Sequence, residues 1–320
     1  MFDVTALGEI LVDFTPNGVS KNGNPIFVAN PGGAPSNLLV SLSHLGKETS
    51  FIGSVGIDKF GRMLVDTLCD NSVTTSGGVV YSDIHTTLAF VHIDESGDRS
   101  FSFYRNPGAD TMLSKDDLKL ELIIKSKIFH VGSILMTNEP SREATRIALK
   151  IAKRNGVTIS YDPNLRPDLW NCLEEARERI VETLYYAEIV KLSEEELEFI
   201  TGTKNVENGA KIITQHYDVD LLFVTAGSTG SYCCQKNTIL FEPGFSLKAL
   251  DTTGCGDAFF GGVLYKLLES NMQYQDISEK RMKEILLFGN AMGAYVAQSK
   301  GGIPSLPTLM EINKFISVKG

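Results

Sequence analysis

Residues 251–260 read Asp-Thr-Thr-Gly-Cys-Gly-Asp-Ala-Phe-Phe, and they follow a short extended run from Phe245 to Leu250. Apolar residues recur at helical spacing at Phe259, Val263 and Leu267, so the stretch is predicted to be a loop that runs into a helix N-terminus. The first backbone N–H groups of a helix have no partner within it and lie at the positive end of its dipole. Two glycines let the backbone approach a bulky anion closely. The stretch therefore predicts a phosphate site.

Asp257 lies one turn into this predicted helix. A carboxylate at that position could remove the proton from a hydroxyl group that attacks the bound phosphate. The alternative interpretation is a capped helix start, in which the aspartate only complements the helix dipole. The rest of the chain has to decide between the two.

The composition is that of an ordinary globular protein, with 320 residues, 42% hydrophobic and 22% charged. The net charge of −9 and the pI of about 5.2 argue against nucleic-acid binding. Apolar runs fall short of the ~18 residues that a transmembrane helix needs, and the N-terminus lacks the basic region of a signal peptide. Five cysteines without framework spacing indicate reduced thiols. We therefore expect a cytoplasmic protein without a membrane partner.

Strand and helix patterns alternate from Ile128 onward, which predicts parallel βαβ units and a doubly wound α/β sheet flanked by helices. Polar clusters follow the strands that end near Asp162, Leu192 and Thr225. Ligands bind at the carboxyl ends of strands in such sheets, so these clusters become candidates for site residues. We find no linker or internal repeat and expect one domain over residues 1–320.

A different pattern occurs between residues 87 and 106. Two β-rich runs, 87–93 and 99–105, flank a turn at 94–98 and predict a hairpin. Together with residues 14–30 it is expected to form a small β-sheet lid on the main domain. Arg105, at the end of the second run, could reach into a cleft beneath the lid, or it could be a solvated hairpin arginine.

Asp13 lies among apolar neighbours near the end of a predicted strand, Val4–Phe14, which Gly8-Glu9 interrupts. A lone carboxylate there is costly unless it meets hydrogen-bond donors, so Asp13 is a candidate for ligand binding. The alternative is a strand-end acid that faces water. A helix with Pro35 near its start is predicted to follow the glycines of the 31–37 stretch.

These features together resemble the PfkB (ribokinase-like) carbohydrate kinases over nearly the whole chain. Residues 31–46 and 251–262 are similar to the two long signatures of that family, in the same order. Within the family the chain is most similar to the fructokinases. The stretches that carry this similarity are Gly8–Phe14, Phe103–Arg105, Asp162–Arg166 and Lys191–Leu197.

The resemblance implies a role for each matching residue. Asp257 would be the general base, and the backbone N–H groups of Gly254, Cys255 and Gly256 would form the anion hole for the transferring phosphoryl group. The sugar hydroxyls would be held by Asp13, Gly33, Asn37 and Arg105, with Arg166 close by. The nucleotide, its phosphates and the water shell of Mg²⁺ would be bound by Asn164, Ser193, Glu196, Thr225, Gly227, Gly230 and Asn290. A monovalent cation, expected to be K⁺, would lie at Asp251, Thr253, Gly301 and Ser305.

Two positions depart from the family pattern. Cys255 stands where alanine is usual, which is tolerable because only its backbone N–H is needed. Ser193 stands where most members have asparagine, which puts its direct contact with the magnesium shell in doubt. A similar serine is common among fructokinase-like members.

The resemblance implies an ATP-dependent sugar kinase that uses Mg²⁺ and forms fructose 6-phosphate from fructose. One alternative is a 2-keto-3-deoxygluconate kinase, and another is a non-catalytic family member that binds sugar or nucleotide. Retention of Asp257 and both glycines argues against the latter, since a binding protein needs no base. The oligomeric state stays open, with a homodimer through the lid as one expectation.

Overall fold

The computed structural model describes residues 1–93, 99–270 and 274–319. Its larger sheet has ten strands in the described part of the chain, parallel up to β12, with two antiparallel strands at one edge. In spatial order these are β14 (Thr238–Pro243), β13 (Gly230–Gln235), β12 (Leu221–Thr225), β11 (Ile189–Ser193), β10 (Thr158–Tyr161), β9 (Ser126–Val131), β1 (Phe2–Leu7), β4 (Thr49–Gly56) and β5 (Val73–Thr74), with β6 (Val79–Ser82) also beside β4.

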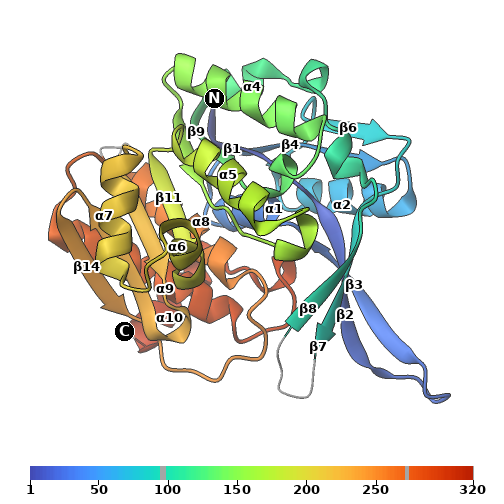
Figure 1. Cartoon of the computed structure of the whole chain (residues 1–320). Coiled ribbons are helices and arrows are strands. Elements are labelled where there is room, and N and C mark those ends of the chain that lie inside the picture. Colours follow the sequence, from blue (N-terminus) through green and yellow to red (C-terminus); the bar gives the residue numbers. More distant parts are fainter. Residues whose placement is uncertain (94–98, 271–273, 320) are drawn as a thin grey trace.

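Helices cover both faces of this sheet (Figure 1). One layer consists of α1 (Ala34–His44), α2 (Lys59–Asp70), α8 (Cys255–Glu269), α9 (Glu279–Val296) and α10 (Leu309–Lys319). The other consists of α3 (Leu120–Ile124), α4 (Ser141–Arg154), α5 (Leu173–Leu184), α6 (Glu194–Thr201) and α7 (Val206–His216). Short 3₁₀ turns lie at Ala109–Met112, Lys115–Asp117, Ile134–Met136, Pro167–Leu169, Gly227–Thr229 and Ile303–Ser305.

The central strands are apolar on both faces because a helix layer covers each of them. In β12, Leu221 and Phe223 belong to the core under α8 and α9, whereas Leu222 and Val224 belong to the core under α6 and α7. Such continuous apolar runs are typical of parallel strands that are buried on both sides. The predicted doubly wound α/β architecture is confirmed.

The second sheet is a separate four-stranded unit in the order β3 (Pro25–Gly32), β2 (Leu11–Val19), β7 (Leu88–Ile93) and β8 (Arg99–Tyr104). It projects from the body as an arm (Figure 1). The hairpin prediction agrees with β7 and β8, while its turn, 94–98, lies outside the described residues. We call this unit the lid sheet.

The first predicted strand, Val4–Phe14, was wrong as one element. The chain leaves the large sheet after Leu7 and enters the lid sheet at Leu11. The backbone at Gly8 lies directly against Pro35 of α1, where an added Cβ would be only 2.2 Å from the proline Cγ. The interruption that Gly8-Glu9 indicated is therefore the point where the chain changes sheets.

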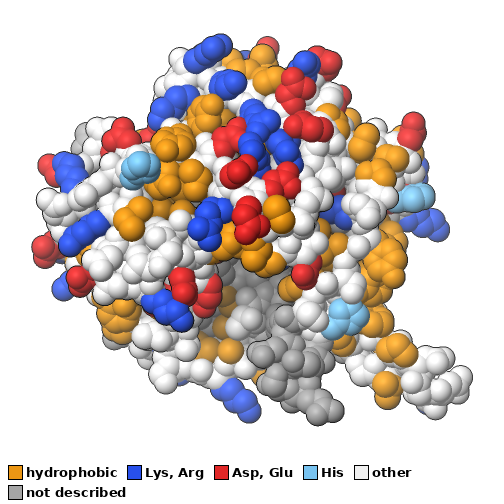
Figure 2. All heavy atoms as spheres, in the orientation of Figure 1, with side chains coloured by type: hydrophobic (Ala, Val, Ile, Leu, Met, Phe, Trp, Pro, Cys, Tyr) orange, Lys and Arg blue, Asp and Glu red, His pale blue; other side chains and the backbone are white. Residues whose placement is uncertain are grey.

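Acidic and basic side chains are interspersed on the face shown in Figure 2, notably over α4 and α5. Arg142 pairs with Glu175, and both Arg146 and Arg179 pair with Glu182. No helix in the described ranges is long and apolar enough to cross a bilayer.

Candidate active site

The start of helix α8 separates two cavities. The larger one, about 380 Å³, lies beneath the lid sheet, and we call it the lid-side cavity. The smaller one, about 240 Å³, lies between α8, α9 and the segment 244–250, and we call it the helix-side cavity. Thr252 and Gly256 line both. A group bound at this helix start can therefore face both cavities at once.

Asp257 lines the lid-side cavity from the first turn of α8 and is 8% exposed. Burial raises the pKa of its carboxyl group to about 6, and the nearby Asp162 carboxylate acts in the same direction. The Asn37 amide donates to Asp257 Oδ2 at 2.7 Å and opposes this shift, as do Lys191 and Arg166. The result is a buried carboxylate with a pKa close to neutrality, which suits a general base.

Helix α8 begins at Cys255, which places Asp257 in its first turn. Gly254, at its N-cap, has a φ of 79° and lies so close to the backbone that an added Cβ would be 3.2 Å from Gly302 Cα. Among the described residues no acceptor takes the backbone N–H of Gly254 or Gly256. The N–H of Cys255 donates to the carbonyl of Thr252 at 3.2 Å. Two of the three predicted anion-hole donors thus have no acceptor in the described part of the chain.

Two further carboxyl groups line the lid-side cavity. Burial raises the pKa of Asp13, on β2, to about 7, against the opposing effect of Arg166. Burial also raises the pKa of Glu9 to about 7, although its Oε1 accepts the N–H of Ala34 at the start of α1 at 3.0 Å. Both groups favour a ligand that donates hydrogen bonds, because such donors would replace the lost water.

Gly33 and Asn37, which are predicted to bind the sugar, also lie in this cavity. Gly33 has a φ of 113°, and an added Cβ would be 2.6 Å from the carbonyl oxygen of Glu9, so only glycine fits there. The Oδ1 atom of Asn37 is buried and has no hydrogen-bond partner among the described residues. Asn37 orients Asp257 with the N–H of its amide.

Arg166 and Asn164 follow β10 and form part of the cavity wall. Arg166 Nη1 donates to Asn164 Oδ1 at 2.6 Å, and the guanidinium lies over the ring of Phe101, 5.7 Å from its centroid. Phe101 and Phe103 reach the cavity from β8 of the lid sheet. The sequence reasoning missed both phenylalanines, although their alternation in the 99–105 run placed them on one face of the hairpin.

Arg105 does not line the cavity. Its side chain is 3% exposed and forms an ion pair with Asp110, with 2.7 Å between Nη2 and Oδ2. Its other donors contact Thr137 Oγ1 at 2.8 Å and the Ile134 carbonyl at 3.1 Å. Ile134 does line the cavity, so Arg105 lies behind the wall rather than in it. In this structure the guanidinium is held in an ion pair, and the expected contact of Arg105 with sugar hydroxyls stays a prediction.

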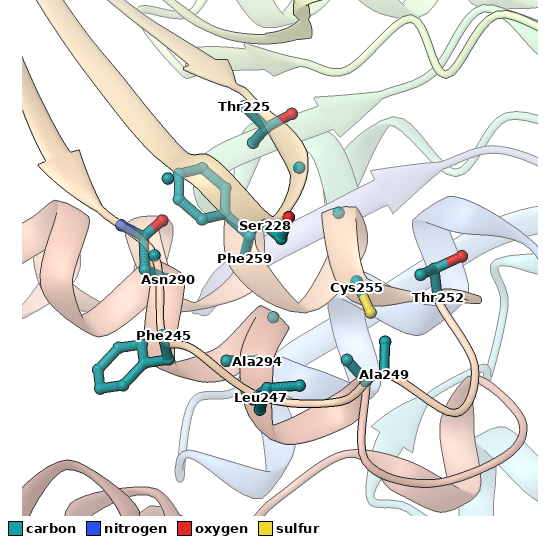
Figure 3. A pocket seen from close by; sticks show the side chains of 16 residues that line it. Thr225, Ser228, Phe245, Leu247, Ala249, Thr252, Cys255, Phe259, Asn290 and Ala294 are labelled. Atoms are coloured by element: carbon teal, nitrogen blue, oxygen red, sulfur yellow. The ribbon is translucent and has the colours of Figure 1, made fainter. Parts of the chain in front are cut away.

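The helix-side cavity contains the predicted residues Thr225, Gly227, Gly230 and Asn290, together with Cys255 (Figure 3). The side chain of Asn290 is already engaged, since it accepts from Ser231 Oγ at 2.7 Å and donates to the carbonyls of Glu242 and Pro243. The sequence reasoning missed the apolar part of the lining, which consists of Phe245, Leu247, Ala249, Phe259, Ala294 and Ala297. In Figure 3, Cys255 and Thr252 lie at one side of this hollow and Asn290 and Phe245 at the other.

Ser193 and Glu196 form a capping box at the start of α6. Glu196 Oε2 accepts the N–H of Ser193 at 2.8 Å, Oε1 accepts that of Leu165 at 2.8 Å, and Ser193 Oγ accepts the N–H of Glu196 at 3.1 Å. Neither residue lines one of the two cavities. Across the described ranges no cluster of three or more acidic, histidine or cysteine side chains could hold a metal by itself.

The predicted cation loop comes together around Asp251, which is 8% exposed. Its Oδ1 accepts the N–H of Thr253 at 2.7 Å, and its Oδ2 accepts that of Gly301 at 3.1 Å. Ser305 Oγ donates to the carbonyl of Gly301 at 2.6 Å. Carboxylate, carbonyl and hydroxyl oxygens thus gather directly behind the start of α8, and oxygen is the ligand that hard cations prefer.

Lys191 is a site residue that the sequence reasoning did not identify. It lies on β11, lines the lid-side cavity and pairs with Asp162, with 3.0 Å between Nζ and Oδ2. The pairing follows from the sheet, because Tyr161 of β10 lies beside Val190 of β11, so the next residues along each strand are neighbours. A lysine inside an apolar strand was the available signal.

Comparison with known proteins adds independent findings. A family model described as "pfkB family carbohydrate kinase" matches residues 1–309. Fructokinase-1 from Zea mays is 44% identical over 315 residues, which cover 98% of this chain and 97% of that protein.

Two solved structures are also similar. One is a fructokinase from Xylella fastidiosa with bound ATP, with a TM-score of 0.91, 30% identity and 99% of both chains covered. The other is a fructokinase from Vibrio cholerae O395 with fructose, ADP and calcium ion bound, with a TM-score of 0.89, 32% identity and coverage of 98% of this chain and 99% of that one.

Proposed function

The chain belongs to the pfkB family of carbohydrate kinases, and on that premise we propose that it transfers the γ-phosphoryl group of ATP to the primary hydroxyl of fructose. The observation that carries the proposal is the position of Asp257. A buried carboxylate lies where the helix start α8 separates two cavities, one lined by carboxyl groups and amides and one largely apolar. A sugar on one side and a nucleotide on the other would meet at this point.

The chemistry follows from that arrangement. Asp257 accepts the proton of the attacking hydroxyl, and the free N–H groups of Gly254 and Gly256 stabilise negative charge on the transferring phosphoryl group. The N–H of Cys255 can join them when it leaves the Thr252 carbonyl. Asp13, Gly33, Asn37 and Arg166 bind sugar hydroxyls. Thr225, Gly227 and Gly230 bind the nucleotide, with the adenine against Phe245 and Phe259.

Fructose fits the lid-side cavity better than a sugar acid does. Asp13, Glu9 and Asp257 already supply carboxyl groups there, and a substrate carboxylate would add a further negative charge. Of the three nearby cations among the described residues, Lys191 is paired with Asp162 and Arg105 lies behind the wall, so Arg166 alone would face the carboxyl groups of both the cavity and a sugar acid. A neutral polyol instead donates hydroxyl hydrogen bonds to Asp13 and Glu9, and its C–H faces can lie against Phe101 and Phe103.

We therefore expect a higher kcat/KM for fructose than for 2-keto-3-deoxygluconate. The measurement is ADP release with ATP, Mg²⁺ and a panel of sugars and sugar acids. A higher kcat/KM for the keto acid would show that fructose is not the preferred substrate, while the assignment as a kinase would stand. Binding of sugar and nucleotide without ADP release would support the alternative of a non-catalytic family member.

We assign magnesium to the nucleotide phosphates and to water molecules oriented by Glu196 and Asn164. Both carboxylate oxygens of Glu196 accept hydrogen bonds from backbone N–H groups. Its contact with the ion is therefore expected to be made through a water molecule, since Mg²⁺ usually keeps several water ligands. Asp251, Thr253, Gly301 and Ser305 would hold K⁺ directly behind the anion hole and keep its N–H groups in place.

If K⁺ occupies this loop, activity with ATP and Mg²⁺ should rise when potassium replaces a large organic cation at constant ionic strength. The physical reason is that a cation bound to Asp251 orders the loop that precedes α8. Titration of K⁺ against initial rate measures the effect. Equal rates in the two salts would remove the cation from the mechanism.

We also propose a single kinase domain whose lid, roughly residues 14–30 and 87–106, closes over the sugar, and a homodimer formed through the lid sheet. The face turned away from the cavity carries a run of aromatic contacts, with Phe90 stacked on Phe14 at 4.7 Å and in edge contact with Phe27 and Tyr104. Tyr104 is 67% exposed. The lid sheet of a second protomer would cover this face, and sedimentation analysis would detect the dimer.

The five free cysteines are consistent with action in the cytoplasm.

A further inference from the structure

Lys191 is a buried cation in a position that its ion pair with Asp162 does not by itself explain. Its side chain is 8% exposed, and Nζ lies 3.2 Å from Asp162 Oδ1 and 3.0 Å from Oδ2. A lysine can donate three hydrogen bonds, so the two carboxylate oxygens leave one N–H available. Lys191 lines the lid-side cavity, so a ligand bound there could accept a hydrogen bond from this donor.

The ammonium group lies against the helix start that separates the two cavities. A Cβ added to Gly256 would be 3.2 Å from Lys191 Nζ and 3.7 Å from Cε. Gly256 supplies one of the free backbone N–H groups of the anion hole. Because Gly256 has no side chain, the ammonium group of Lys191 can lie close to the N-terminus of α8. Its charge and the positive end of the helix dipole therefore act on the same bound group.

The charges around this point need such a cation. Asp13 and Asp257 line the cavity, Asp162 lies beside Lys191, and a transferring phosphoryl group brings more negative charge. The second cation, Arg166, donates through Nη1 to Asn164 and Leu165 and lies over Phe101, on the lid side. Lys191 is the cation placed beside the helix start.

We propose that Lys191 is a further catalytic residue, whose free N–H donates to an oxygen of the transferring phosphoryl group while Asp162 holds the ammonium in place. The proposal rests on the phosphoryl-transfer function above. In that step the sugar oxygen forms a bond to the γ-phosphorus and gives its proton to Asp257. The bond from the γ-phosphorus to the bridging oxygen breaks, and its electron pair leaves on ADP. Lys191 stabilises the charge on the non-bridging oxygens throughout.

The decisive variant is the pair Lys191→Met and Asp162→Asn in one chain. Lys191→Met alone leaves Asp162 buried without its cation and can destabilise the fold, whereas the double variant removes both charges and keeps the approximate shapes. Lys150→Met, on the exposed face of α4, is the matched control. Lys191→Arg keeps the charge but moves the donors.

If Lys191 contacts the phosphoryl group, the folded double variant should lose about 10- to 100-fold in kcat, as expected for one charged hydrogen bond. The loss should persist at a pH well above 6, where Asp257, whose pKa is about 6, is ionised. Lys191 lowers the pKa of Asp257 and Asp162 raises it, so the acid limb should move little in the double variant. If the double variant has the kcat of the unaltered protein, Lys191 only neutralises Asp162, and the proposal is overturned.

A second readout does not depend on the sugar. Calorimetry without sugar should show that the double variant binds ATP about tenfold more weakly and ADP nearly as well as the unaltered protein. Equal losses for ATP and ADP, or no loss for either, would contradict contact with the γ-phosphoryl group. If the unaltered protein fails to phosphorylate fructose, the proposed substrate is wrong, while this comparison still tests Lys191.

Discussion

Replacing Asp257 by asparagine is expected to lower kcat by about 10²–10⁴-fold, the usual contribution of a positioned general base. Asparagine has the same size and can still accept the hydrogen bond that Asn37 donates at 2.7 Å, but it cannot take up the proton of the attacking hydroxyl. The fold and the affinity for ATP should be retained. The measurement is the rate of ADP release at saturating sugar and nucleotide.

The pH dependence gives the same variant a second test. Burial raises the pKa of Asp257 to about 6, and only the ionised form can act as a base. Besides the change near pH 7 that Asp13 and Glu9 add through sugar binding, the kcat/KM of the unaltered protein should therefore have a limb that falls as the pH drops through about 6. The residual activity of Asp257→Asn should lack this limb.

Asp66→Asn, on the exposed face of α2, serves as the matched control and should leave kcat unchanged. Near-normal turnover of Asp257→Asn would mean that the aspartate only complements the dipole of α8. The anion hole would then have to supply the catalysis alone, and the alternative interpretation of the 251–260 stretch would hold.

The parts of the site that local chemistry defines were predictable from the sequence. The glycines of the 251–260 stretch and the apolar spacing beyond it indicated a helix start, and α8 begins there. Gly33 could be recognised in the same way, because its φ of 113° reflects a demand of the local backbone. A positive φ is a local property of the backbone and could be predicted from neighbouring residues, whereas the close approach of Glu9 to Gly33 could not.

Residues whose roles depend on the register between strands were not predictable. Lys191 faces Asp162 only because β10 and β11 align Tyr161 with Val190. The sequence pattern of either strand alone does not indicate how the two strands align. The run Phe245–Leu250 joins neither sheet, and its contribution of Phe245 and Leu247 to the helix-side cavity could not be read from its local pattern.

Arg105 is a different case, because its side chain pairs with Asp110 and its contact with sugar hydroxyls stays a prediction. Its position at the end of β8, beside the lid-side cavity, was foreseen, but its partner Asp110 lies behind the cavity. A buried guanidinium group is stabilised when it pairs with a nearby carboxylate. In this structure the guanidinium pairs with the buried Asp110 and does not line the cavity.

Replacing Arg105 by alanine is therefore expected to lower the free energy of unfolding by about 3–5 kcal/mol, the usual cost of removing one partner of a buried ion pair. Asp110, 1% exposed, would keep a charge whose remaining contact is the hydroxyl of Thr87. The donors to Thr137 and to the carbonyl of Ile134 would also be lost. Denaturant unfolding without ligands measures the effect.

Two further variants separate this explanation from a role in sugar binding. Arg105→Met combined with Asp110→Asn removes both charges and should recover most of the lost stability, because no unpaired charge stays buried. Arg154→Ala, at the exposed end of α4, should change stability by no more than about 0.5 kcal/mol. If Arg105→Ala unfolds like the unaltered protein while the KM for fructose rises, the guanidinium must leave Asp110 and contact the sugar in the liganded enzyme. The ion pair behind the wall would then be a resting state, and the contact that the sequence suggested would be the functional one.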